Sequence, residues 1–317
     1  MAALQDSITA TVEAAQQRRS RRRSVLIVAL AAALAASLLA GVGIGGVPIT
    51  VHEIVGILLS RTGIEGDWGF SAQQETVFLA VRLPRAVLAV LTGAGLAASG
   101  AALQGLFRNP LADPGLIGVS SGAALAAVAT IVMGAPVAAW LGVSSYALMP
   151  LAAFGGGLLS TFVVYSIGMR NGVADTATML LAGVAINAIA LASIGFLTFM
   201  SDDRQLRELN LWMLGSLGGV TWSSLLPALP FLVLPLIGLP RLARALNALL
   251  LGQRDAQYLG FDPVAVTRAV IVLGALSVGA GVAITGIIAF VGLVVPHLVR
   301  LVAGPDHRVL LPASMLL

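Results

Sequence analysis

Long apolar stretches alternate with short polar segments along this chain. The longest stretches without a charged side chain cover Val25–Gly43, Ala86–Phe107, 114–169, Ala177–Ser201 and Val270–Val299. A helix needs about 20 apolar residues to cross the hydrocarbon core of a bilayer. A soluble helical core would instead show polar stripes at helical spacing, and these stretches have none. The pattern therefore predicts an all-α polytopic membrane protein.

The apolar stretches divide into eight approximate spans. They cover residues 25–44, 77–106, 115–133, 145–168, 177–200, 223–240, 266–289 and 293–303. Arginines beside a span mark the cytoplasmic side. Five of them lie between Arg18 and Arg23, so residues 1–24 are predicted to be a cytoplasmic N-terminal tail. Most of the 18 arginines then face the cytoplasm, and the exceptions are Arg61, Arg82, Arg85, Arg204 and Arg207.

Composition excludes several classes of function. Hydrophobic residues make up 58% of the 317 residues and charged residues only 10%, against about 25% charge in soluble proteins. The chain has no cysteine, so it has no disulfide. All 18 basic residues are arginine, and a P-loop needs a lysine to reach the phosphates. The chain is therefore no P-loop ATPase. Membrane topology, and not nucleic-acid binding, accounts for its net charge of +4.

Two segments of the chain resemble one another. Leu91–Pro110 and Ser277–Pro296 share the pattern G-A-G-x-A-x-[ST]-G, and each ends in a proline at the same position. The threading makes the two copies run in opposite directions, which is typical of the inverted repeats of transporters. Small-residue motifs can also recur by chance, and they allow close helix packing without any role in transport.

The repeat predicts five transmembrane helices per half, ten in all. Repeat one covers about 25–200 and repeat two about 211–317. About eight of the ten expected helices then lie in this chain. On this interpretation the transmembrane domain, 25–317, is incomplete at its C-terminal end.

Four ordered segments resemble the FecCD-type permeases, which are membrane subunits of ABC importers for haem, iron-siderophores and cobalamin. The longest, Arg82–Ala123, reads RLPRAVLAVLTGAGLAASGAALQGLFRNPLADPGLIGVSSGA. The others are LWMLGSLGGVTW (Leu211–Trp222), LGQRDAQYLGFDP (Leu251–Pro263) and GIIAFVGLVVPHLVRLVAGPDHRVLLPAS (Gly286–Ser314). The resemblance covers about residues 30–317.

The resemblance implies a set of partners and a place in the cell. It implies a second copy of the permease, as a homodimer, in a bacterial inner membrane with the N-terminus in the cytoplasm. Two separate cytoplasmic ATPase subunits would bind ATP and Mg, and a periplasmic binding protein would deliver the substrate. Haem is the first expectation for the transported substrate, with a ferric siderophore or cobalamin next. This chain itself is expected to hold no cofactor and no catalytic site.

Arg82 and Arg85 lie three residues apart at the predicted outer end of the second span. By the resemblance, they meet acidic residues of the binding protein. Ion pairs at such a rim contribute orientation and association rate more than affinity. The alternatives are contact with lipid phosphate and a local pair with Glu75.

The loop 241–265 is the longest cytoplasmic connection within the core. Its two Leu-Gly steps predict two short helices with glycine turns. By the resemblance, this loop couples to the ATPase, and the candidate residues are Gly252, Asp255, Ala256, Leu259 and Gly260. The alternative is an ordinary solvated loop. A second cytoplasmic turn contains Asn109 and Asp113, either of which can cap a helix end.

Asn187, Ser193 and Thr198 are polar residues within the fifth span, which lines the pathway in the family. Polar groups at membrane depth usually face the bundle or a cavity. They are therefore candidates for the translocation pathway, and hydrogen bonding between helices is the alternative. The spans contain no paired carboxylates and no histidine cluster, so neither a proton relay nor a metal site is expected. An ion-driven secondary transporter and a structural membrane protein are the remaining alternatives.

Overall fold

A computed structural model describes residues 2–64, 66–142, 145–170 and 173–317. The first half contains α1 (Ala2–Gly43), α2 (Val51–Arg61), α3 (Ala72–Val77), α4 (Leu83–Leu106), α5 (Val119–Leu141), α6 (Ser145–Gly168) and α7 (Thr176–Phe199). The second half contains α8 (Asp203–Leu214), α9 (Trp222–Leu225), α10 (Leu229–Arg241), α11 (Ala243–Leu251), α12 (Gln253–Tyr258), α13 (Pro263–Thr285), α14 (Val291–Ala303) and α15 (His307–Leu316).

Short elements join several of these helices. A π-helical turn, Phe78–Arg82, connects α3 to α4 without a break, and 3₁₀ turns occur at Pro114–Ile117 and Leu226–Ala228. The strands β1 (Met169–Arg170) and β2 (Val173–Ala174) form a small antiparallel pair between α6 and α7, with Met169 opposite Ala174. The fold is therefore helical almost throughout, as the apolar pattern predicts.

Six helices in the described part of the chain are long and apolar enough to cross a membrane. They are Arg21–Gly43, Ala72–Leu106, Leu148–Gly168, Thr176–Phe199, Trp222–Arg241 and Pro263–Thr285. Two shorter apolar helices, Val119–Gly134 and Val291–Ala303, match the third and the eighth predicted spans. Each predicted span thus has a helix, and the prediction of a polytopic all-α membrane fold is confirmed.

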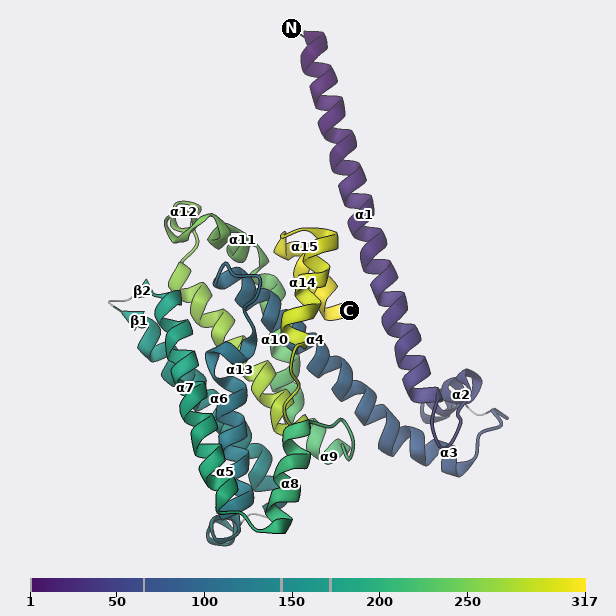
Figure 1. Cartoon of the computed structure of the whole chain (residues 1–317). Helices are drawn as coiled ribbons and strands as arrows, with labels where there is room; N and C mark the ends of the chain where they lie inside the picture. Colours follow the sequence, from purple (N-terminus) through teal and green to yellow (C-terminus); the bar gives the residue numbers. More distant parts are fainter. Residues whose placement is uncertain (1, 65, 143–144, 171–172) are drawn as a thin grey trace.

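The helices α4 and α13 form the centre of the bundle (Figure 1). Buried residues make up 67% of the apolar window of each, compared with 6% for α1. These two helices carry the repeated motif. A Cβ added at Gly95 would lie 2.1 Å from Ser277 Oγ, and one added at Gly281 would lie 2.9 Å from Thr92 Cγ2. The copies therefore pack directly on each other and run in opposite directions, as the inverted repeat predicts.

The predicted span 266–289 ends four residues early. α13 stops at Thr285 because Gly286 adopts φ 72° and ψ −165°, a conformation that glycine tolerates best. The side chain of Thr285 donates hydrogen bonds to the carbonyls of Gly281 (3.0 Å) and Gly286 (2.9 Å). The carbonyl of Thr285 in turn accepts from Ser216 N. The backbone turn at Gly286, with the hydrogen bond from Ser216, therefore ends this helix inside an apolar stretch.

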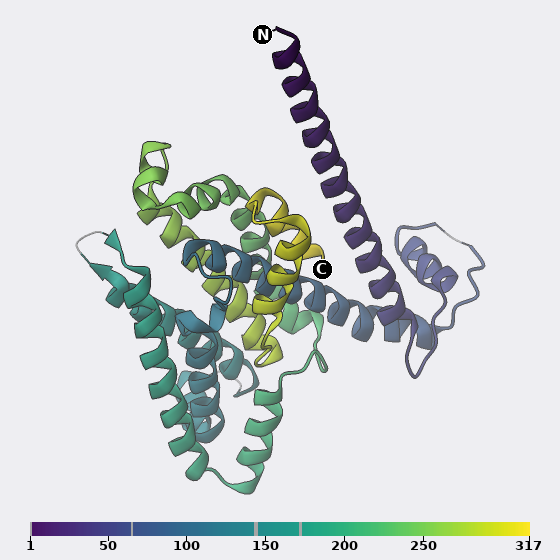
Figure 2. The same ribbon diagram turned by 45° about the horizontal axis from the view of Figure 1, so that its top comes forward.

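The N-terminal end of α1 projects beyond the bundle in both ribbon views (Figures 1 and 2), whereas a later part of the helix contacts α15, where Arg23 pairs with Asp306. The sequence predicts a tail over 1–24 and a span from residue 25. In the structure, α1 runs unbroken from Ala2 to Gly43, so no change of secondary structure separates tail from span. The side chains of Arg18 and Arg19, which support the predicted topology, lie outside the described part of the chain.

Candidate functional site

The predicted coupling loop forms two short helices, α11 and α12, at one end of the bundle (Figure 1). Gly252 separates them with φ 128°, and Gly260 follows α12 with φ 86°. Both conformations favour glycine, which confirms the predicted glycine turns. We call residues 251–260 the α11–α12 elbow.

The α11–α12 elbow presents one buried and several exposed side chains. Ala256 is fully buried and fixes the underside of α12. Asp255 is exposed, and 59% of the surface of Leu259 is exposed to solvent. Tyr258 is 89% exposed. The sequence reasoning missed this tyrosine, although an aromatic residue in a polar loop was a usable signal. The elbow therefore offers a mixed apolar and charged surface that nothing in the described chain covers.

An open cleft of about 640 Å³ lies beside the elbow. It is lined by Arg108, Asp175, Thr176, Leu251, Gly252, Gln253, Arg254 and Asp255. These residues come from the end of α4, the start of α7 and the elbow. In the neighbouring turn, Asp113 caps the 3₁₀ turn Pro114–Ile117, because its Oδ1 accepts from Gly115 N (2.7 Å). Asn109 Oδ1 accepts from Leu111 N (3.0 Å) within the turn and caps no helix. The elbow thus meets two other connections at the same end of the bundle.

Asn247 attaches α11 to the turn between α14 and α15. Its Oδ1 accepts from His307 N (2.9 Å) and lies 2.8 Å from His307 Nδ1, while its Nδ2 donates to Asp306 Oδ1 (2.8 Å). Because Asn247 presents an acceptor to the ring, Nδ1 carries the proton in neutral His307. Asp306 also pairs with Arg23 of α1 at 3.1 Å. These side chains, the Asn247 network, join α1, α11 and α15.

The electrostatics of the Asn247 network favour neutral His307 and ionised Asp306. His307 is 1% exposed. Burial, with a smaller contribution from Arg300, lowers its pKa to about 4. Burial alone would raise the pKa of Asp306, but hydrogen bonds from Asn247 and the backbone of Arg308, with the charge of Arg23, hold it below its ordinary value. The network therefore sets both charge states by burial and by its own hydrogen bonds.

Glycine 105 lets the ring of His307 approach α4. A Cβ at this position would lie 2.3 Å from His307 Nε2. The sequence reasoning missed the whole Asn247 network. Its members are far apart in the chain, so no local pattern identifies them.

At the opposite end of the bundle, Arg82 and Arg85 have different surroundings. The guanidinium of Arg82 donates to the carbonyls of Val42, Gly43 (3.1 Å) and Val47. The last carbonyls of a helix lack partners within it, so Arg82 caps the end of α1. Arg85 is exposed, and it lines a groove together with Arg82.

Glu75, the alternative ion-pair partner expected for Arg82 and Arg85, pairs with another arginine in the structure. Glu75 pairs with Arg61 at 2.7 Å. Within the described residues, Arg85 has no ion-pair partner. Of the two predicted docking residues, Arg85 is thus the one whose charge is available to a partner.

The three polar residues of α7 also differ from one another. Asn187 Oδ1 accepts from Ser121 Oγ of α5 (2.5 Å), and Asn187 Nδ2 donates to the carbonyl of Gly115 (3.2 Å). Ser193 and Thr198 donate to carbonyls of their own helix, at 2.9 and 2.7 Å. Asn187 therefore joins helices, and the two hydroxyls are satisfied locally. The structure does not bring the three side chains together in one polar cluster.

Comparison with known proteins gives consistent matches. Residues 30–317 match the profile of the FecCD transport family. The chain is 48% identical over 242 residues to the hemin transport system permease protein HmuU of Yersinia pestis, covering 76% of this chain and 71% of that protein. It is 44% identical over 250 residues to the cobalamin import system permease protein BtuC of Halobacterium salinarum, covering 79% and 65%.

A solved structure extends these matches to the fold. It is an ABC transporter assigned to the metal-chelate type, in an inward-facing conformation. The TM-score is 0.77 at 30% sequence identity, and the match covers 92% of this chain and 86% of that one.

Proposed function

Because this chain belongs to the FecCD transport family, we propose that it is the permease subunit of an ATP-driven importer for a large metal chelate. The observation that carries the proposal is the α11–α12 elbow, an exposed connection at the end of a membrane bundle. A transport subunit driven from outside needs such a surface. The Asn247 network supports this role because it connects α11, the helix that leads into the elbow, to α1, α15 and, through the His307–Gly105 contact, the central helix α4.

The proposed energy source is a separate pair of cytoplasmic ATPase subunits, which would hold ATP and Mg. This chain lacks the lysine of a P-loop. Gly252, Asp255, Leu259 and Gly260 would form the contact, with Tyr258 added by its 89% exposure. Ala256, the fifth predicted residue, is fully buried and would support α12 from within. Closure of the ATPases would displace the elbow as a rigid body.

Haem is the proposed substrate. A relative named as a hemin permease is 48% identical to this chain. Relatives named as cobalamin and vitamin B12 permeases, at 37–44% identity, support cobalamin as the alternative, and a ferric siderophore is the third. Asn187, Ser193 and Thr198 would line or support the pathway. In this proposal, the substrate passes through and is no resident cofactor.

The proposed assembly is a homodimer in a bacterial inner membrane, with the N-terminus in the cytoplasm. Arg85, with Arg82 beside it, would form ion pairs with acidic residues of a periplasmic binding protein. The exposed charge of Arg85 supports this docking role. Arg82, which caps α1, would hold the rim in place.

Reconstitution tests the proposal. The permease is purified in nanodiscs with a candidate ATPase subunit from the same organism, and ATP turnover is measured with a binding protein loaded with haem, cobalamin or siderophore. Stimulation by the haem-loaded protein alone supports haem import. Stimulation by the cobalamin-loaded or siderophore-loaded protein instead would assign that compound as the substrate. Failure to bind any ATPase would refute the importer proposal.

A matched pair of variants tests the coupling surface. Leu259→Asp places a charge on the exposed apolar part of the elbow and should reduce ATPase binding at least ten-fold, because apolar contact is exchanged for an unpaired charge. Arg244→Gln alters an exposed residue of α11 outside the elbow and should bind normally. Equal binding by both variants would remove the elbow from the interface.

A further inference from the structure

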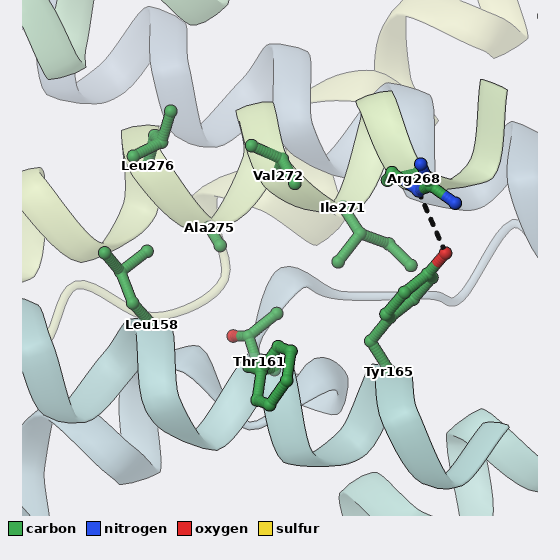
Figure 3. Close-up of a pocket in the computed structure, with 9 residues that line it drawn as sticks. Leu158, Thr161, Tyr165, Arg268, Ile271, Val272, Ala275 and Leu276 are labelled. Atoms are coloured by element: carbon green, nitrogen blue, oxygen red, sulfur yellow. Dashed lines mark hydrogen bonds between the residues drawn. The ribbon is translucent and has the colours of Figure 1, made fainter. Parts of the chain in front are cut away.

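A groove lies between α6 and α13 on the outside of the bundle (Figure 3). Its volume is about 200 Å³. The floor is formed by buried residues, among them Ile271 and Ala275, and the rim by the exposed Phe162 and Val272. Thr161, the hydroxyl residue of the floor, donates to its own helix at 2.9 Å. We call this the α6–α13 groove. Its interior offers only apolar contact.

One end of the α6–α13 groove is polar. Arg268 and Tyr165 face each other there, with 3.5 Å between Arg268 Nε and the tyrosine hydroxyl (Figure 3). Arg268 is exposed and forms no ion pair with a described carboxylate. The carboxylate of Asp262 influences it electrostatically. The Oδ1 atom of Asp262, however, accepts hydrogen bonds from Val264 N and Ala265 N at the start of α13.

The polar end lies near one membrane surface and the apolar part lies deeper. Arg268 comes five residues after the start of α13, about 8 Å along the helix axis, and Tyr165 comes three residues before the end of α6. Leu276 and Leu158, at the other end of the groove, are about 10–12 Å further along. The groove thus runs from the boundary on the α11–α12 side toward the middle of the bilayer.

We infer that the α6–α13 groove is a binding site for one anionic phospholipid of the leaflet on the α11–α12 side. The phosphate would contact the guanidinium of Arg268 and the hydroxyl of Tyr165. An acyl chain would lie between the leucines on the apolar floor. Arginine and tyrosine commonly anchor at the headgroup level, and an anionic headgroup gives Arg268 the direct ion-pair partner that the described residues do not supply.

A second copy of this chain fits the groove less well. Neither α6 nor α13 contains a carboxylate. A twofold contact made by these two helices would therefore bury Arg268 without a counter-charge, which is costly. A lipid phosphate avoids this cost. Charge complementarity thus favours lipid over protein as the occupant.

Lipid retention tests the inference. The full chain is reconstituted in vesicles of equal phosphatidylglycerol and phosphatidylcholine and extracted in mild detergent, and retained lipid is counted by native mass spectrometry. Arg268→Gln should reduce the preference for phosphatidylglycerol about five-fold, as expected for one basic residue at a membrane surface. Val272→Trp, which obstructs the rim, should reduce retention of both lipids.

Arg241→Gln is the matched control. Arg241 is an exposed arginine at the last turn of α10, and it lies outside the groove. This variant should retain phosphatidylglycerol as the unmodified chain does. Equal preference in the Arg268 and Arg241 variants, or no preference in the unmodified chain, would overturn the inference.

A cysteine variant distinguishes lipid from protein at the same site. The chain has no cysteine, so Val272→Cys introduces a single reactive thiol on the groove rim. Absence of a disulfide-linked dimer in oxidised vesicles, with retained phosphatidylglycerol preference, supports the lipid site. A disulfide-linked dimer as the main product would assign the groove to a contact between copies and overturn the lipid site.

Discussion

The contact between Gly100 and Gly292 provides the sharpest test of the central packing. Gly100 lies in the repeated motif of α4, where the helix meets α14. A Cβ added at Gly100 would lie 1.8 Å from the carbonyl oxygen of Gly292. Ordinary van der Waals contact begins near 3.4 Å. Because the neighbouring atom is backbone, no side-chain rotation can relieve the overlap, and the two helices must separate or distort.

Gly100→Ala should therefore destabilise the protein. Overpacking in a well-packed core costs about 1–3 kcal/mol and occasionally more. The change from glycine to alanine in a helix returns about 0.5–1 kcal/mol. The net expectation is a loss of about 0–2.5 kcal/mol in the free energy of unfolding. The loss should be at the upper end of that range if α4 and α14 cannot move apart.

Gly93→Ala is the matched control on the same helix. A Cβ added at Gly93 has no neighbour within 4 Å, so this variant should gain about 0.5–1 kcal/mol from helix propensity alone. Both variants are compared with the unmodified chain by thermal unfolding in one detergent. If Gly100→Ala unfolds at the same temperature as Gly93→Ala, the close approach of α4 and α14 is wrong.

Three further predictions concern the Asn247 network and the arginine rim. The pKa of His307 is lowered from 6.5 to about 4, so the unfolded state binds more protons between these values. Stability should thus be full above about pH 6.5 and fall by about 3 kcal/mol as the pH drops to 4. His307→Asn should lose this component of the pH profile, and an unchanged slope would refute the assignment. Asn247→Ala removes three hydrogen bonds and should cost about 2–4 kcal/mol. Leu250→Ala, on the exposed side of α11, should cost much less, and equal losses would argue against the network. Arg82→Gln should cost about 1–3 kcal/mol by uncapping α1. Arg85→Gln should leave unfolding nearly unchanged and instead slow association of the binding protein, and the reverse pattern would contradict both assignments.

The sequence predicted the helices well because the bilayer constrains them strongly. In lipid, every backbone polar group must be satisfied internally, so an apolar stretch of sufficient length becomes a helix. The α11–α12 elbow was also predictable, since Gly252 and Gly260 mark positions where the backbone needs a positive φ. The end of the 266–289 span was not. Thr285 and Gly286 lie in a continuous apolar stretch, and the helix stops there because Gly286 turns the backbone where Ser216 N bonds to the Thr285 carbonyl.

The candidate site was predicted only in part for a similar reason. Residue type and depth identified Asn187, Ser193 and Thr198 as a group, yet Asn187 bonds to another helix and the other two bond to their own. Arg82 and Arg85 are close in sequence, but only Arg82 lies beside the end of α1. The 89% exposure of Tyr258 is visible only in the folded loop. Side-chain partners depend on which helices are neighbours, and this is not a local property.

The sequence by itself determined that the chain is a bundle of membrane helices, that it contains two related segments, and that it lacks the lysine of a P-loop. Hydropathy, glycine position and composition are local properties, so they can be read without a fold. Only the tertiary structure decided that Asn247 meets His307, that Gly100 meets Gly292, and that Arg268 faces Tyr165 at the end of an apolar groove. Each of these pairs depends on the register of two packed helices. Shape complementarity along the whole length of both helices sets that register.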